Sequence, residues 1–139
     1  DEILSTLGRF KGDFFDQSIT DERLMALAER FAHHAVFIVG SDGNLDIGFV
    51  AFYCNDTIHR TAFISMIIIG SEFQSKGYGR KLLDKSMEIA SQAGMHSIRL
   101  EVSQVNWHAL AFYDRLGFNL FSQKEVSYIL EKNIDRGEV

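Results

Sequence analysis

The chain has 139 residues and a mass of 15.8 kDa, a size that suits one domain with its own core. Hydrophobic residues make up 46% and charged residues 24%, a balance typical of soluble globular proteins. The net charge of −5 gives no electrostatic basis for a general nucleic-acid-binding role, and no signal peptide or long apolar span predicts a membrane segment. Because Cys54 is the only cysteine and has no internal partner, we expect a reducing, cytoplasmic location.

The N-terminal third predicts two helices. A short one is expected around residues 3–7, ending near Gly8, followed by three aromatic side chains in a loop or helical turn. These aromatic residues are Phe10, Phe14 and Phe15. We interpret them first as core residues and second as a cover over an acceptor site. A longer helix begins after the N-cap candidate Thr20, and four apolar residues form its buried stripe: Leu24, Leu27, Ala28 and Phe31. His33 and His34 end it, and since helical neighbours point about 100° apart, dipole complementation and exposure explain them better than a metal site.

Three strands should follow as an antiparallel meander. Two apolar runs at 35–40 and 45–54 flank Asp42-Gly43, which is a strong hairpin signal. A connection at 55–60 leads to the β-branched run at 61–69, which has the composition of a buried strand. Cys54 ends the second strand, and we interpret it as a small hydrophobe because no basic or histidine side chain brackets it in the sequence.

The C-terminal half predicts alternating helices and strands. An amphipathic helix at 77–93 ends at Gly94, and the strand 98–102 places Arg99 and Glu101 on one face with three aliphatic side chains on the other. A helix capped by Asn106 ends at Gly117, and two antiparallel strands at 118–122 and 126–131 close the chain. The crossover helix implies that strands 63–69 and 98–102 are parallel neighbours.

The turn from the 61–69 strand into the 77–93 helix predicts an anion site. The first N–H groups of a helix have no intrahelical partner, the macrodipole adds positive charge, and the glycines at 77 and 79 let a ligand approach the backbone. The expected ligand is a phosphate or pyrophosphate. A Walker A motif does not match, because Ser75 stands where it needs glycine and Gly77 stands where it needs Ser or Thr. A dinucleotide-binding fingerprint does not match either, because Leu82 stands where its third glycine would be. An ordinary glycine-rich turn remains the alternative.

Asn106 and Tyr113 are seven residues apart, almost two helical turns, so they share one face of their helix. With parallel strands as above, that face is directed toward the cleft beside the anion loop. Taken alone, a cap and a core residue are the more ordinary interpretations.

Two motifs together resemble one family. Gln74-x-x-Gly77-x-Gly79 resembles the acetyl-CoA pyrophosphate loop of the GNAT superfamily of N-acetyltransferases, and the segment from Leu100 to Phe118 resembles its second half. The matching residues of that half are Leu100-Glu101-Val102, Asn106, Ala111-Phe112-Tyr113 and Leu116-Gly117-Phe118. The likeness is good over 61–118 and loose over 35–60.

The resemblance implies a mixed α/β (α+β) fold, in one domain over 1–139. Its central sheet is mixed and mostly antiparallel, with splayed parallel middle strands and helices on both faces. Acetyl-CoA is the implied cosubstrate, wedged between the splayed strands. The backbone of Ile67, Ile68 and Ile69 would pair with pantetheine, and Asn106 would contact the same arm. The implied pyrophosphate loop comprises Gln74, Ser75, Lys76, Gly77, Tyr78, Gly79 and Arg80. Ser71 stands where many members have proline, and the chain starts in a helix where many members have a strand, which puts the N-terminal edge in doubt.

The chemistry that this resemblance implies needs few side chains. A backbone N–H near Ile69 would hold the oxyanion, and Tyr113 would supply a proton to the departing thiolate. Glu101 is the candidate base for the incoming amine, with Glu72 as a weaker candidate; the alternative for Glu101 is a solvated or salt-bridged strand residue near Arg99.

We therefore expect an acetyl-CoA-dependent N-acetyltransferase that acts on a primary amine of a small molecule. The alternatives are a peptide or protein acceptor at an N-terminus or lysine, and a non-catalytic CoA-binding module. A homodimer is left open, and no metal, nucleic-acid or membrane partner is expected.

Overall fold

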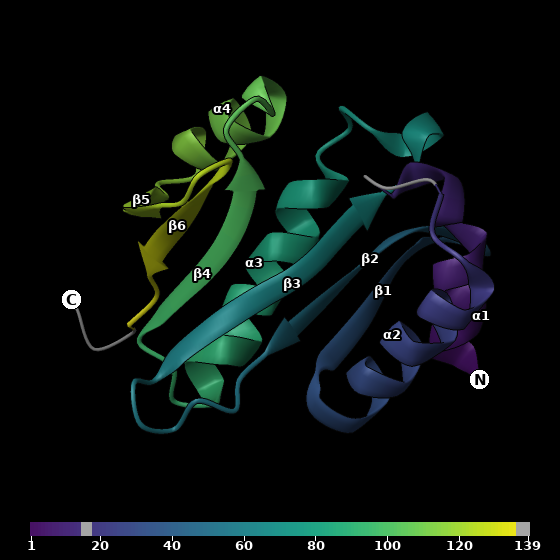
Figure 1. The fold of residues 1–139 in the computed structure, drawn as a ribbon, viewed down its shortest axis with the longest axis horizontal. Coiled ribbons are helices and arrows are strands. Elements are labelled where there is room, and N and C mark those ends of the chain that lie inside the picture. Colours follow the sequence, from purple (N-terminus) through teal and green to yellow (C-terminus); the bar gives the residue numbers. More distant parts are fainter. Residues whose placement is uncertain (15–17, 136–139) are drawn as a thin grey trace. The chain divides into compact units, whose positions relative to one another are not determined.

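The computed structural model describes residues 1–14 and 18–135 (Figure 1). Its helices are α1 (Glu2–Arg9), α2 (Asp21–His34), α3 (Tyr78–Gln92) and α4 (Trp107–Arg115), with short 3₁₀ turns η1 (Lys11–Asp13) and η2 (Ser71–Phe73). Its strands are β1 (Val36–Asp42), β2 (Leu45–Tyr53), β3 (Thr61–Ile69), β4 (Ser97–Ser103), β5 (Asn119–Gln123) and β6 (Ser127–Asn133). The helices and strands expected from the sequence therefore form within a few residues of their predicted bounds.

The six strands described form one sheet in the order β1-β2-β3-β4-β6-β5. Strands β3 and β4 are parallel, from Thr61 opposite Ser97 to Ile64 opposite Leu100. The other pairs are antiparallel, including β1 with β2 and β6 with both β4 and β5. A mixed, mostly antiparallel sheet with one parallel pair confirms the predicted fold class.

The chain divides into two compact units. Unit 1 comprises 1–53 and 66–86, and unit 2 comprises 54–65 and 87–139, taken over the described residues. Strand β3 and helix α3 each pass from one unit into the other. The units are described separately below, and the single domain remains a prediction.

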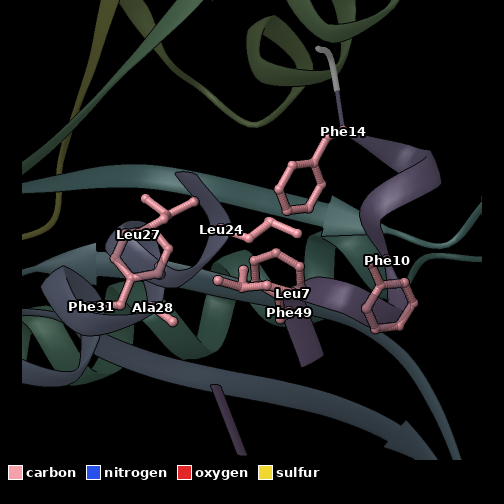
Figure 2. Close-up of a cluster of buried hydrophobic side chains, with 9 residues drawn as sticks. Leu7, Phe10, Phe14, Leu24, Leu27, Ala28, Phe31 and Phe49 are labelled. Atoms are coloured by element: carbon pink, nitrogen blue, oxygen red, sulfur yellow. The ribbon is translucent and has the colours of Figure 1, made fainter. Parts of the chain in front are cut away.

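The core of unit 1 forms where α1 and α2 pack on β2 (Figure 2). Its nine buried residues are Leu7, Phe10, Phe14, Leu24, Leu27, Ala28, Phe31, Phe49 and Ala51. Phe49 is central, with ring centroids 5.2 Å from Phe37 and 6.0 Å from Phe10. The apolar stripe of α2 and the core interpretation of the first two N-terminal aromatic residues are confirmed; Phe15 lies outside the described residues.

The β1–β2 hairpin is tighter than its sequence suggested. Ser41 and Asp42 stay paired with β2, so only Gly43 and Asn44 form the turn, and Gly43 has the left-handed φ of 64° that such a turn requires. The register shifts between Gly40 and Ser41, and Ser41 Oγ donates to Asp46 Oδ1 at 3.0 Å. The polar residues at 41–42 therefore belong to the strand because a bulge turns them to partners across the hairpin.

Unit 2 has its buried side chains on alternate positions of β4. Ile98, Leu100 and Val102 are buried, whereas Arg99 and Glu101 lie on the other face, as predicted. Helix α3 ends at Gly94 with a Schellman motif, in which Met95 N donates to Ala90 O and Gly94 N to Ser91 O, both at 3.0 Å. Gly117 ends α4 in the same way, and both glycines have φ near 90°.

Candidate functional site

The loop between β3 and α3 carries the predicted anion site in unit 1. After η2 the chain turns sharply, with left-handed φ values of 65° at Ser75 and 86° at Gly77, and α3 begins at Tyr78. Ser75 is the more strained of the two because it carries a side chain in a region that favours glycine. Such strain persists where the surroundings hold it, and it is common in ligand-binding loops.

Most backbone N–H groups of this loop have no acceptor in the described part of the chain. The N–H of Lys76 closes the turn over Gln74 and Ser75, and no carbonyl or side-chain oxygen of the described residues accepts a hydrogen bond from the other five N–H groups between Ser75 and Arg80. The first helical bond is Lys81 N to Gly77 O, at 3.2 Å. Five such donors at the positive end of a 15-residue helix make the kind of site that binds phosphate. Lys76 and Arg80 are exposed beside them.

Two side chains tether this loop. The Gln74 amide Nε2 donates to Ile69 O at 3.1 Å, and the Tyr78 hydroxyl donates to Asp42 Oδ2 at 2.9 Å. The hydrogen bond to the Asp42 carboxylate, together with partial desolvation, raises the pKa of Tyr78 above its ordinary value. The sequence alone could not reveal Asp42, because it lies 36 residues away on the β1–β2 hairpin.

The end of β3 offers further backbone groups. Within unit 2, β3 pairs with β4 from Thr61 opposite Ser97 to Ile64 opposite Leu100, and β3 continues into unit 1 as far as Ile69. Strand β2 comes very close to this end of β3, since a Cβ added to Gly48 would lie 2.2 Å from Ile68 O. Residues Ile67 to Ile69, expected to pair with pantetheine, lie in this stretch.

In unit 2, Asn106 caps α4, with its Oδ1 accepting from Ala109 N at 3.2 Å. The cap uses the carbonyl oxygen of the amide and leaves its NH₂ group for another partner. Tyr113 lies seven residues on and is only 8% exposed, with its ring 5.2 Å from that of Phe112 and 5.4 Å from that of Phe118. The ring of Tyr113 is therefore part of the core, as its ordinary interpretation held. The loop at 74–80 lies in the other unit, so the shared direction expected for Asn106 and Tyr113 stays a prediction.

The Tyr113 hydroxyl, unlike its packed ring, has no described partner. Burial raises the pKa of Tyr113 to about 12, so the phenol stays protonated at any working pH. No described residue hydrogen-bonds to it, and no fully buried side-chain oxygen or nitrogen in the described chain lacks a partner. The hydroxyl must therefore reach the surface of the unit, where it can donate to a ligand.

Glu101 is held by two neighbours on the exposed face of β4. Its Oε2 accepts from the hydroxyl of the buried Ser127, and Lys124 Nζ lies 3.5 Å from its Oε1. The Ser127 hydrogen bond, against partial desolvation and with help from Lys124, holds the pKa of Glu101 below its ordinary value. Arg99 instead pairs with Glu131 at 2.7 Å, and the alternative of a solvated or salt-bridged Glu101 keeps its basis, because Lys124 takes the place of Arg99 and the Glu101 side chain is 42% exposed.

The turn that carries these partners is fixed by Gln104. Lys124 N donates to Ser127 O at 2.8 Å, and Gln104 Nε2 donates to Lys124 O at 2.8 Å and to Ser127 O at 3.3 Å. Sequence reasoning missed Gln104, Lys124 and Ser127 because their roles depend on the β4–β6 register. The only available signal was the strand prediction itself, which leaves that register open.

The structure also bears on Glu72, on metal binding and on membrane-spanning helices. Glu72, the weaker base candidate, is exposed in η2 and lines a hollow of about 410 Å³ together with Arg9, Asp13 and Phe73. Residues 1–14 and 18–135 contain no group of three or more His, Cys, Asp or Glu side chains arranged to hold a metal ion. In the same residues, no helix is both long and apolar enough to cross a membrane.

Comparison with known proteins places these features in context. A family model described as the acetyltransferase (GNAT) family matches residues 4–118. N-alpha-acetyltransferase 30 of Schizosaccharomyces pombe is 33% identical over 84 residues, which cover 58% of this chain and 55% of that protein. The [ribosomal protein bS18]-alanine N-acetyltransferase of Haemophilus ducreyi is 30% identical over 79 residues, covering 57% and 54%. The chain thus spans about half the length of these curated relatives.

A solved structure shows the same fold. The spermidine N-acetyltransferase of Vibrio cholerae, crystallised with CoA and spermine, superposes with a TM-score of 0.77 at 20% identity. The superposition covers 95% of this chain and 90% of that one.

Proposed function

Because the chain belongs to the acetyltransferase (GNAT) family, whose enzymes transfer an acetyl group from acetyl-CoA, we propose that it is an N-acetyltransferase with acetyl-CoA as donor. The observation that carries this proposal is the set of five N–H groups between Ser75 and Arg80 that have no acceptor among the described residues, which suits the pyrophosphate of CoA. We propose that the backbone of Ile67 to Ile69 pairs with the amide groups of pantetheine and that the Asn106 side-chain NH₂, whose Oδ1 caps α4, is a further donor.

Calorimetric titration tests the donor. Acetyl-CoA should bind, and S-acetylpantetheine, which lacks the pyrophosphate and nucleotide, should bind at least about tenfold more weakly, because the loop would have no anion to hold. Equal affinity for the two compounds would remove the loop from the proposal.

The proposed chemistry is direct attack of a neutral amine on the thioester. Glu101 accepts the proton of the amine, directly or through water, and a backbone N–H near Ile69 holds the oxyanion. The lowered pKa of Glu101 makes it a weak base, so a water-mediated or late proton transfer suits it best. Since a thiol has a pKa of roughly 8.5, complete transfer from a phenol with a pKa of about 12 is unfavourable by several kcal/mol. Tyr113 therefore acts chiefly by hydrogen-bonding the departing sulfur.

For the acceptor we propose the α-amino group of a peptide or protein. Two relatives bear the names of N-terminal or alanine acetyltransferases, which favours this class over the small-molecule amine that the sequence alone suggested. The small-molecule amine remains the second candidate because a protein of the same fold was crystallised with spermine. A cytoplasmic location stays a prediction that rests on the single cysteine.

A turnover assay separates the acceptor classes. Acetyl-CoA is incubated with peptides that differ in their first residue, with the same peptides blocked at the α-amine, and with polyamines and amino sugars, and thiol release is measured. A peptide acceptor predicts turnover that disappears on blocking the α-amine. Turnover with polyamines or amino sugars alone would favour the small-molecule class, and lack of thiol release with every amine would favour a non-catalytic CoA-binding module.

A further inference from the structure

A hollow of about 350 Å³ lies between the β1–β2 hairpin and helix α3, wholly within unit 1. Its floor is apolar, because it includes the side chains of Ile47 and Leu82, which are 3% and 6% exposed. The hairpin packs closely on the helix at this floor, since a Cβ added to Gly40 would lie 3.3 Å from Ile47 Cγ1 and from Leu82 Cδ2. Pockets for small molecules measure roughly 300–1,000 Å³, so the hollow suits part of a ligand.

The hollow adjoins the loop at 74–80. Tyr78 is the first residue of α3 and one of the residues that line the hollow. Its hydroxyl donates to Asp42 Oδ2 at 2.9 Å, which fixes the side chain between the loop and the hairpin. A ligand whose pyrophosphate occupies the loop therefore has the hollow directly beside it.

Two lysines supply positive charge along the hollow. Lys81 and Lys85 are four residues apart on α3, so they share one face of the helix, and both are exposed where they line the hollow. Lys81 Nζ lies 5.8 Å from the centre of the Tyr78 ring, which places its ammonium back toward the loop. Among the described residues that line the hollow, the one acidic side chain is Asp42, which already accepts from Tyr78. The charge of the hollow therefore favours an anion.

The spacing between the loop and the lysines fits a single nucleotide. Lys81 is four residues beyond Gly77, a rise of roughly 6 Å along the helix axis, and Lys85 lies roughly 6 Å further on. In CoA the 3′-phosphate and the 5′-pyrophosphate are attached to the same ribose, so these two anionic groups are about one helical turn apart. A pyrophosphate held by the loop would thus bring the 3′-phosphate to the level of the two lysines.

We propose that Lys81 and Lys85 bind the 3′-phosphate of CoA at this hollow and so select CoA over donors that lack this phosphate. A phosphate monoester carries about −1.5 to −2 charges at neutral pH, and each ammonium gives it a charge-assisted hydrogen bond. The apolar floor then contacts the uncharged part of the nucleoside. The inference rests on the proposed function and adds a determinant of donor specificity to it.

Calorimetry of the full chain with two donors tests the hollow. Acetyl-CoA and 3′-dephospho-acetyl-CoA differ only in the 3′-phosphate, so both keep the pyrophosphate that the loop would hold. One exposed ion pair is worth up to about fivefold in affinity. With two ammonium groups on one phosphate, we expect acetyl-CoA to bind about five- to twentyfold more tightly than the dephospho compound. Equal affinities would overturn the inference.

Variants assign the preference to the two lysines. Lys81→Gln and Lys85→Gln should each weaken binding of acetyl-CoA by about two- to fivefold and leave binding of the dephospho compound nearly unchanged. Lys11→Gln is the matched control, because Lys11 is a lysine of the same unit whose ammonium lies 3.6 Å from Asp21, outside the hollow and the loop. A parental preference in the double Lys81→Gln, Lys85→Gln variant, or an equal loss of preference in Lys11→Gln, would each contradict the assignment.

Phosphorus NMR examines the 3′-phosphate itself. The second ionisation of a phosphate monoester has a pKa of roughly 6. Two neighbouring ammonium groups favour the dianion, so the pKa of the 3′-phosphate should be lower in the complex than in free acetyl-CoA. In the double variant it should return toward the value of the free compound. A pKa that does not change on binding to the parent would mean that the 3′-phosphate stays in solvent, against the inference.

The outcome is separable from that of the proposed function. A protein that binds both donors equally and transfers the acetyl group from each retains the function and loses only this inference. A protein that binds neither donor by calorimetry loses both.

Discussion

At the scale of single residues, the proposed chemistry depends on two groups whose surroundings weaken them as acid and base. Burial makes Tyr113 a poorer acid than a free phenol, and the Ser127 hydrogen bond makes Glu101 a poorer base than a free carboxylate. Both groups keep one charge state near neutral pH, with the phenol neutral and the carboxylate ionised. The arrangement favours hydrogen bonding and electrostatic stabilisation over complete proton transfer.

Removal of the Tyr113 hydroxyl tests this role. Tyr113→Phe keeps the ring contacts with Phe112 and Phe118, so the variant should fold and bind acetyl-CoA nearly as the parent does. Turnover should fall at least about tenfold, a loss of roughly 1.4 kcal/mol of transition-state stabilisation. Tyr128→Phe, on β6 of the same unit, is the matched control and should change turnover little. Parental turnover in Tyr113→Phe, where chemistry limits the rate, would make this tyrosine a packing residue.

The hydroxyl of Ser127 sets the acid limb of the pH profile. Its hydrogen bond is the largest cause of the lowered pKa of Glu101, so Ser127→Ala should raise that pKa toward or above its ordinary value. The carboxylate would then be protonated at a higher pH, and kcat/KM should begin to fall at a higher pH than in the parent. Carbon NMR of labelled glutamate gives the pKa directly. An acid limb at the parental pH would mean that Glu101 does not govern it.

At the scale of elements, the loop before α3 is stiffened before any ligand arrives. Its left-handed residues, Ser75 and Gly77, are fixed between the Gln74 tether to β3 and the Tyr78 tether to the β1–β2 hairpin. Because the N–H groups already point away from internal acceptors, little ordering is left to occur on binding. Preorganisation of this kind favours affinity for the anion.

A glycine pair with similar backbone angles separates binding from folding. Gly77→Val and Gly43→Val each place a β-branched residue at positive φ, 86° and 64° respectively, and each should destabilise the protein by about 1–3 kcal/mol. Only Gly77→Val should also weaken acetyl-CoA binding, measured by calorimetry on folded protein, because only Gly77 lies in the anion loop. Equal loss of affinity in both variants would show that the effect comes through general destabilisation.

At the scale of the whole molecule, the chain passes between the compact units three times, once between Tyr53 and Cys54 and twice within an element. Strand β3 changes unit between Ser65 and Met66, and helix α3 changes unit between Ser86 and Met87. The proposed functional groups are divided in the same way, with the anion loop in unit 1 and Glu101, Asn106 and Tyr113 in unit 2. Since neither β3 nor α3 can unfold in one unit without exposing its continuation, we expect the units to unfold together.

The aromatic core gives a measurement of that coupling. Phe49→Ala removes the central ring of the unit 1 cluster shown in Figure 2 and should lower the free energy of unfolding by about 3–5 kcal/mol. Urea titrations followed by circular dichroism and by amide signals of β4 should give one midpoint, shifted equally for both. A midpoint for β4 that does not move would show that unit 2 is stable on its own.

Sequence patterns predicted the elements well because caps and periodicity are local. Thr20 and Asn106 each begin a helix, and Gly94 and Gly117 each end one, where expected, and β4 alternates as its residues require. The partners of the candidate site could not be predicted, because they come from other strands. Asp42 reaches Tyr78, and Ser127 reaches Glu101, only through a hairpin bulge and a strand register that no local pattern encodes.

The five amides between β3 and α3 that have no acceptor in the described residues also make ligand binding at this loop measurable by hydrogen exchange. An amide without an acceptor exchanges its hydrogen with solvent at nearly the rate of an unfolded chain, whereas a core amide exchanges only when the structure around it opens, which is rare. In the free protein, Ser75 to Arg80 should therefore become deuterated within the first seconds beside a slowly exchanging β3. A bound pyrophosphate would convert the same stretch into a protected one, so hydrogen exchange can report occupancy of the loop without any acceptor amine. Rapid exchange that persists at saturating acetyl-CoA would show that the cofactor is held elsewhere.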